Sequence, residues 1–145
     1  MNRLTSLVSL LVLGLLLAPG TVSATPTTDA PNPDDRVKEV RVQNQMVRLL
    51  TSEEVRRQEQ ALRIVTHYAQ VDTFSTGFYR PITPHLAAIV TDGESEALSI
   101  MAVSALATIG TPQAVRRLAE VTPQIASARV QRVARQALTH YAKAR

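Results

Sequence analysis

The chain has 145 residues, which is enough for one small domain. It contains no cysteine, so a disulfide framework, a thiolate metal site and a cysteine nucleophile are all excluded. The net charge of +4 is unevenly distributed, because residues 112–145 carry seven basic side chains and one acidic side chain. The C-terminal third is therefore the basic part of the chain.

Residues 1–24 have the pattern of a secretory signal peptide. Arg3 gives a positive start, residues 4–18 form an apolar run, and Val22-Ser23-Ala24 offers the small residues that signal peptidase requires. We expect cleavage after Ala24 and a mature protein that is periplasmic or secreted. An uncleaved membrane anchor is the alternative, although the apolar run is shorter than a typical span of about 20 residues.

Residues 25–35 hold three prolines and no large apolar side chain, so they predict a disordered Pro/Thr linker. The folded domain is then expected over residues 36–145. Its first helix, residues 36–50, has apolar side chains at roughly helical spacing. The expected apolar face consists of Val37, Val40, Val47 and Leu50, with Val42, Met46 and Leu49 beside it.

A second helix is expected to begin at Thr51. The sequence Thr51-Ser52-Glu53-Glu54 has the pattern of a capping box, in which Glu54 reaches back to the first backbone N–H group. The buried stripe of this helix is expected to contain Ala61, Leu62, Val65, Tyr68 and Ala69.

Residues 70–80 are the longest break in the helical pattern, and they contain Phe74, Phe78 and Tyr79. Aromatic side chains dominate the energetics of many interfaces, so these three residues are a candidate exposed anchor for a partner. The alternative is that they fold back over the hairpin junction and fill the core.

A helix of about ten residues follows, with Thr83-Pro84 near its start and a turn at Asp92-Gly93. Its buried residues are expected to be Leu86, Ile89 and Val90.

Residues 98–115 are the most informative stretch. One apolar stripe follows the helical period and consists of Leu98, Met101, Ala102, Ala105, Leu106 and Ile109. Gly110 suits the end of this helix, and Thr111-Pro112 suits the start of the next. The opposite side is apolar as well, at Ile100, Val103 and Ala107. This indicates either a central helix enclosed by neighbours or an apolar strip that receives a partner.

Two further helices complete the chain. A short helix after Pro112 is marked by Val115, Leu118 and Val121, and the last helix spans about residues 126–143. The apolar stripe of the last helix contains Val130, Val133, Ala134, Ala137, Leu138 and Tyr141.

Ala-Leu pairs recur at 61–62, 105–106 and 137–138, and self-similarity of this kind is typical of repeat proteins. The link Ile109-Gly110-Thr111-Pro112 with Ala114-Val115, and the string from Val130 to Leu138, resemble the HEAT repeat family in its short, phycobilisome-lyase-type form. The resemblance covers about residues 36–143. It implies an all-α fold, a short right-handed α-solenoid of about three antiparallel helical hairpins. It does not imply a chemistry, because repeat families host many functions.

The resemblance also implies that the second helix of each hairpin lines a concave surface with an uncharged floor and basic ends. Such a surface suits a partner segment with apolar anchors and flanking carboxylates, and the alternative is a solvated face. The candidate partner-binding residues are Arg56, Gln60, Arg63, Ile100, Ser104, Arg129, Arg132, Gln136 and Lys143.

No catalytic, cofactor or metal constellation is visible. His67, His85 and His140 fall on three different expected helices, without the spacing of a metal motif. We therefore expect a non-enzymatic interaction module or scaffold that binds another protein or peptide segment, with no small-molecule substrate. The alternative is an anionic ligand, such as lipid head groups, lipopolysaccharide or, less expected after export, nucleic acid, bound by the basic C-terminal third.

Overall fold

The computed structural model describes residues 33–144, and all regular structure in this part is helical, which confirms the expected all-α class there. The expected signal peptide and linker residues 25–32 lie outside the described residues. Two short 3-10 helices, η1 (Thr76–Tyr79) and η2 (Thr122–Gln124), accompany the α-helices. The α-helices are α1 (Pro33–Leu50), α2 (Val55–Gln70), α3 (Thr83–Asp92), α4 (Glu96–Ile109), α5 (Pro112–Val121) and α6 (Ala128–Lys143).

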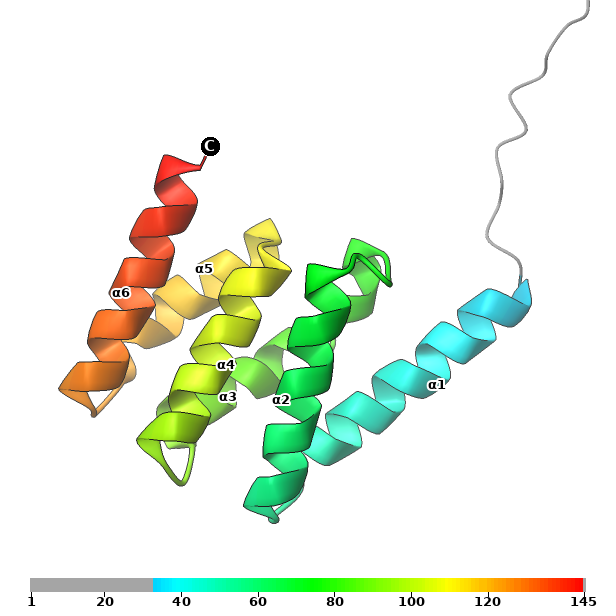
Figure 1. The fold of residues 1–145 in the computed structure, drawn as a ribbon, viewed down its shortest axis with the longest axis horizontal. Coiled ribbons are helices and arrows are strands. Elements are labelled where there is room, and N and C mark those ends of the chain that lie inside the picture. Colours follow the sequence, from blue (N-terminus) through cyan, green and yellow to red (C-terminus); the bar gives the residue numbers. More distant parts are fainter. Residues whose placement is uncertain (1–32, 145) are drawn as a thin grey trace, which may run out of the picture. The chain divides into compact units, whose positions relative to one another are not determined.

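The helices form two layers. In Figure 1, α2, α4 and α6 lie side by side in one row, and α3 and α5 lie behind that row. The chain direction alternates from each helix to the next, so α2, α4 and α6 run the same way. Helix α4 occupies the centre, because it packs against α2 and α6 in its own row and against α3 and α5 behind it.

The sequence of α4 explains its central place. Leu98, Ala102, Val103, Ala105 and Leu106 are completely buried. A helix that is apolar on most sides must be covered on most sides, and four neighbours cover this one. Of the two alternatives for this stretch, the enclosed central helix is therefore the one that the structure shows, while a narrow outer strip of α4 stays partly open.

The turns around α4 depend on specific residues. Gly110 ends the helix with φ +58, a left-handed conformation that favours glycine. The Thr111 hydroxyl then accepts a hydrogen bond from the Ala114 N–H at 3.2 Å and caps α5. The expected end of this helix at Gly110 and the expected start of the next at Thr111-Pro112 are both confirmed. At the other turn, a Cβ on Gly93 would lie only 2.6 Å from the Ile89 carbonyl oxygen, so close approach requires glycine there.

The first helix differs from the expectation at its start. It begins at Pro33, so residues 33–35, which were expected in the linker, form its first turn. Asp34 and Asp35 lie in that turn, where negative charge interacts favourably with the helix dipole. Asp35 also pairs with Lys38 at 3.4 Å.

The expected apolar face of α1 is wrong in part. Val37 and Val40 are 59% and 52% exposed, whereas the buried side chains of this helix are Met46 and Leu50. The physical reason is that α1 lies at the edge of the structure and is covered on one side only, which is the side of Met46. Val37 and Val40 point to the other side.

The expected capping box at Thr51 is also wrong. Helix α2 begins at Val55, and its N-cap residue Glu54 makes no side-chain capping bond. The Thr51 hydroxyl instead donates to the Val47 carbonyl oxygen at 3.0 Å, which ties it to the end of α1. The Ser52 hydroxyl accepts from the Glu54 N–H at 3.2 Å and forms the connecting turn. Within α2, the expected Ala61, Leu62 and Val65 are buried.

Two of the three aromatic residues of the 70–80 segment belong to the core, and Phe74 packs against it half-buried. Phe78 is completely buried and Tyr79 is 5% exposed, both within η1. Phe74 stacks on Phe78 with ring centroids 4.1 Å apart, and Tyr68 meets Phe74 edge-on at 5.0 Å. Of the two alternatives for Phe74, Phe78 and Tyr79, the exposed anchor is therefore wrong, and the fold-back into the core is the one that the structure shows, because the rings cover one another.

The last two helices follow the expected pattern closely. Leu118 of α5 and Val130 and Ala134 of α6 are buried. Val133, Ala137 and Leu138 are half-buried against the same core. Ser127 caps α6 by accepting from the Val130 N–H at 3.3 Å.

Candidate interaction surface

The side of the α2–α4–α6 row that α3 and α5 leave uncovered is called the front face here. On α2 this face presents Arg56, Gln60 and Arg63, all exposed, because residues three and four apart lie on one side of a helix. With Glu59 and Ile64 they line a shallow hollow of about 440 Å³. The sequence-predicted residues of α2 are thus brought together.

The charge of this hollow is only partly balanced. Within the described residues, neither Arg56 nor Arg63 forms an ion pair, although Glu59 lines the same hollow. The neighbouring Arg57 is different, since its Nε lies 2.8 Å from Glu54 Oε2. Two guanidinium groups of α2 therefore remain available for carboxylates of a ligand.

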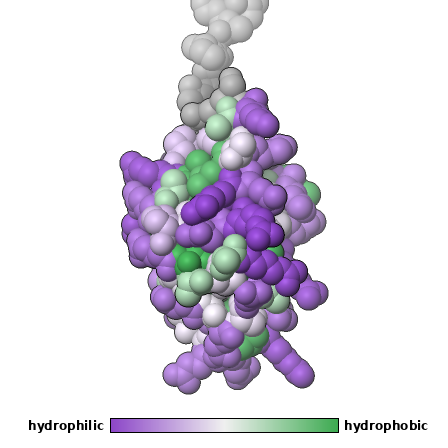
Figure 2. Space-filling model, turned by 90° about the vertical axis from the view of Figure 1, so that its left-hand side faces the viewer, coloured by the Kyte–Doolittle hydropathy of each residue, from purple (hydrophilic) through white to green (hydrophobic). Residues whose placement is uncertain are grey.

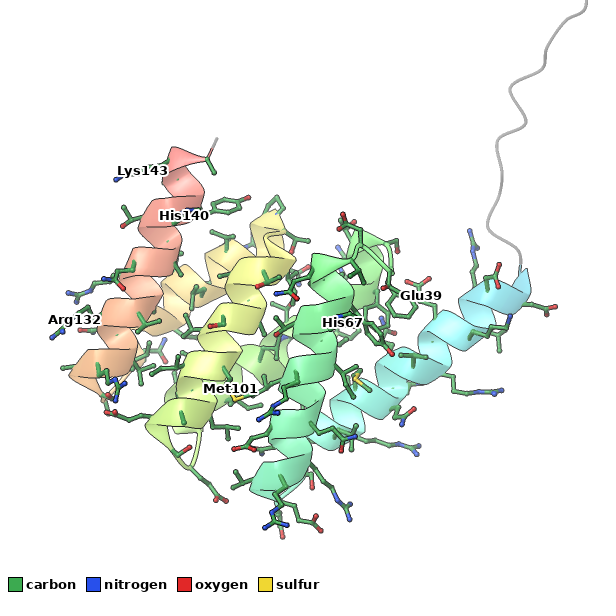
Figure 3. All side chains as sticks on the ribbon, in the orientation of Figure 1. Glu39, His67, Met101, Arg132, His140 and Lys143 are labelled. Atoms are coloured by element: carbon green, nitrogen blue, oxygen red, sulfur yellow. The ribbon has the colours of Figure 1, made fainter. Side chains whose placement is uncertain are left out.

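The middle of the front face is nearly uncharged. Ile100 and Met101 of α4 are half-buried against the core, and Ser104 is exposed. Figure 3 shows Met101 on the side of α4 that faces α2. The charged residue of α4 is Glu96, which lies in its first turn. A ligand that crosses from α2 to α4 therefore passes from charged side chains to uncharged ones.

Helix α6 contributes Arg129 and Gln136, both exposed. Arg129 Nη1 lies 3.9 Å from Glu96 Oε2, and Glu96 Oε1 accepts a hydrogen bond from the Ser127 hydroxyl. This ion pair is solvent-exposed and long, so it holds Arg129 only weakly.

Arg132 and Lys143 were expected on the same surface and do not lie there. Figure 3 shows both side chains pointing off the free side of α6, away from α4. The reason is that α6 is the last helix of the row, so the side that a further helix would cover is open. With Arg135 these residues form a basic outer side of α6, and Figure 2 shows this end of the molecule as largely hydrophilic.

Sequence reasoning missed two residues of the front face. Met101 was assigned to the buried stripe of α4, and the helical period could not show that its side chain stays partly open towards α2. Glu96 lies in the first turn of α4, and the groups that it contacts, on Ser127 and Arg129, are 31 and 33 positions further along the chain. The signal that could have found this contact is the absence of acidic residues from α6, because a helix with only basic charges attracts a carboxylate from a neighbouring helix.

The histidines lie apart, His67 on α2, His85 on α3 and His140 on α6. Among residues 33–144, no three histidine, aspartate or glutamate side chains are grouped closely enough to hold a metal ion. In the same part of the chain, no helix has the length and apolar character needed to cross a membrane.

Comparisons of the chain with protein-family models, with curated proteins and with solved structures give no match.

Proposed function

We propose that this chain is an exported binding protein without catalysis of its own, and that it holds another protein on its front face. Three antiparallel hairpins, α1–α2, α3–α4 and α5–α6, give a short right-handed solenoid of the HEAT type. The sequence resemblance and the alternating helix directions of Figure 1 support this proposal. Such a scaffold holds its surface rigidly, which lowers the entropy lost when a partner binds.

The observation that carries the proposal is the pair Arg56 and Arg63, which lack ion pairs within residues 33–144 and lie on α2, the helix that packs against α4 with its uncharged middle. Apolar contacts at the middle of an interface are desolvated on binding, while charges at its rim select and orient the partner. The preferred partner is therefore a helical or extended protein segment with apolar side chains next to aspartate or glutamate.

Charge reversal tests the proposal. Arg56→Glu with Arg63→Glu is expected to lower co-purification of cross-linked partners from the envelope fraction at least about tenfold, because repulsion replaces two attractive contacts. The matched control is Arg132→Glu with Lys143→Glu, which makes the same change of charge on the outer side of α6. Equal capture by wild type and the α2 variant would contradict the proposal.

A second function is favoured by a separate observation. Helix α6 carries Arg129, Arg132, Arg135 and Lys143 and no acidic residue, and its outer side is open. This surface suits an anionic ligand such as a lipid head group or lipopolysaccharide. In that case the α6 variant, and not the α2 variant, should elute earlier from heparin and reduce the dependence of binding on salt concentration.

Export is the remaining part of the proposal, and it concerns residues that the structure does not describe. We expect a mature chain that begins at Thr25, after cleavage behind Ala24. N-terminal sequencing of the protein recovered from the periplasm or medium tests this, and recovery of an intact Met1 would contradict it.

A further inference from the structure

Two adjoining hollows lie on the part of the molecule formed by η1, α3 and α5. The first, of about 450 Å³, is lined by residues of η1 and of the start of α5, together with Arg80. The second, of about 210 Å³, is lined by residues at the start of α3 and along α5. Gln113 lines both hollows, so they meet at the start of α5. No residue of α2, α4 or α6 lines either hollow, so this place is separate from the front face and from the outer side of α6.

The charges that line the two hollows do not balance. Arg117 Nη1 lies 2.9 Å from Glu120 Oε2, and Arg116 Nε lies 3.8 Å from Glu120 Oε1, so one carboxylate serves two guanidinium groups. Arg80 forms no ion pair with the residues that the structure describes. Glu120 is the one acidic residue of the two linings, and the three arginines therefore leave an excess of two positive charges.

Neutral hydrogen-bond donors line the first hollow together with Arg80. The Thr76 hydroxyl and the Gln113 side-chain amide make no hydrogen bond within residues 33–144. The Thr111 oxygen accepts from the Ala114 N–H at 3.2 Å, and its own hydroxyl proton remains available. Hydroxyl, amide and guanidinium groups can all donate, so the first hollow offers donors from four side chains to one ligand.

A phosphate group fits this combination of charge and donors. A phosphate monoester carries about two negative charges near neutral pH and three acceptor oxygens, so it matches both the excess charge and the number of donors. Guanidinium groups bind phosphate oxygens in pairs, with good geometry. A single carboxylate carries one negative charge and would leave a positive charge unbalanced.

We propose that the two hollows form a binding site for the phosphate group of a monoester. Arg80, Gln113 and the two threonine hydroxyls contact the phosphate oxygens, and the guanidinium groups of Arg116 and Arg117 balance the remaining charge. The group can belong to a soluble phosphate ester or to a lipid head group, because both present the same oxygens. This site goes beyond the proposed function, since it requires neither the front face nor a protein partner.

Titration of the purified protein with inorganic phosphate at constant ionic strength, followed by NMR of the backbone amides, tests the proposal. The signals of Gly77 and Gln113 should shift with a dissociation constant of roughly 1 mM, because the contacts are open to solvent. Arg80→Gln should raise this constant at least about fivefold, because the unpaired charge is lost. Arg63→Gln is the matched control, since Arg63 also lacks an ion pair among the described residues and lines a hollow of about 440 Å³.

Three results would overturn the proposal. The first is a wild type in which Gly77 and Gln113 do not shift. The second is an Arg80→Gln variant that binds phosphate like wild type, and the third is equal weakening by Arg80→Gln and Arg63→Gln, which would indicate only a general attraction to a basic protein.

Two further probes distinguish the sources of the phosphate group. If the ligand is a lipid head group, wild type should sediment with phosphatidylcholine vesicles that contain phosphatidic acid, and Arg80→Gln should not. If it is a soluble ester, glycerol 3-phosphate should shift the same amides while the protein stays in solution. Arg132→Glu with Lys143→Glu should leave the phosphate titration unchanged, so failure of either proposed function would be seen separately from failure of this site.

Discussion

Helices α1 and α4 contain similar numbers of residues and contribute very differently to the fold. The longer one, α1, has 18 residues, of which Met46 and Leu50 are buried hydrophobics. The shorter one, α4, has 14 residues and packs against four other helices. The difference follows from position rather than length, because a helix buries only the sides on which it has neighbours.

Helix α1 is held by polar contacts in addition to its small apolar face. Gln43 Nε2 donates to the Phe78 carbonyl oxygen at 2.8 Å, and the Ser75 hydroxyl donates to Glu39 Oε1 at 3.2 Å. Both contacts join α1 to η1 and the loop before it. An edge helix held in this way can present its other side to a partner, whereas α4 can present only a narrow strip.

The largest expected effect comes from truncating the core of α4. Leu106→Ala should lower the free energy of unfolding by about 3 kcal/mol, because Leu106 is completely buried and its loss leaves a cavity. Val37→Ala on α1 should change it by less than about 0.5 kcal/mol. Urea denaturation measures both changes. Similar losses in the two variants would contradict the claim that α4 contributes more to stability than the outer side of α1.

A smaller loss is expected at the turn into α4. Gly93→Ala should cost about 2 kcal/mol, since its Cβ would meet the Ile89 carbonyl oxygen at 2.6 Å and the Ser99 hydroxyl at 2.8 Å. The Ser99 hydroxyl itself donates to that carbonyl at 3.1 Å, so neither atom can move freely. Gly77→Ala is the control, because the nearest atom to its Cβ, Ser75 Oγ, is 3.6 Å away. Thermal unfolding should separate the two variants, and equal midpoints would refute the close approach.

A still smaller loss of stability is expected when the attachment of α1 to the rest of the structure is weakened. Gln43→Ala leaves the Phe78 carbonyl without its side-chain donor and should cost about 1 kcal/mol. Hydrogen exchange should show faster opening of α1 with little change in α4. Asn44→Ala, on the exposed side of the same helix, should leave both the stability and the exchange pattern as they are in wild type.

The smallest effect is expected at Tyr79. Its hydroxyl is buried without a hydrogen-bond partner in the described residues, so Tyr79→Phe should be neutral or stabilising by up to about 1 kcal/mol. Burial, with a smaller contribution from Asp72, raises the pKa of the Tyr79 phenol above the ordinary value of 10.0. The unfolded chain ionises first, so wild-type stability should fall as the pH rises from 10.0 through the folded-state pKa.

The same substitution removes this alkaline loss, so the advantage of Tyr79→Phe over wild type should grow above pH 10.0. Chemical denaturation at pH 7 and at pH 10.5 measures the difference. An advantage that does not change with pH would show that the phenol is solvated in the folded state.

Much of the fold could be predicted from the sequence where local signals agree. The end of α4 and the start of α5 were predicted because Gly110, Thr111 and the helical period of the apolar residues indicate the same boundaries. The start of α2 was not, since the Thr51 hydroxyl bonds to the preceding helix instead of capping the next. The exposure of Val37 depends on which helices pack against α1, and the sequence of α1 alone does not show which helices these are.

Less of the candidate surface could be predicted. Arg56, Gln60 and Arg63 share one side of one helix, so their grouping follows from the period alone. Whether α6 turns Arg132 towards α4 or away from it depends on how the whole helix is rotated against its neighbours. That rotation is set by Val130 and Ala134 packing into the core together.

The most direct measurement of the central claim is photo-cross-linking in cells from a probe placed at Ser104, in the middle of the front face. We expect a discrete adduct with a partner protein from Ser104 and none from the same probe at Ala119, an exposed residue of α5. The Ser104 adduct should be lost when Arg56→Glu and Arg63→Glu are introduced together. An adduct from Ala119 but not from Ser104 would contradict the assignment of the front face as the binding surface.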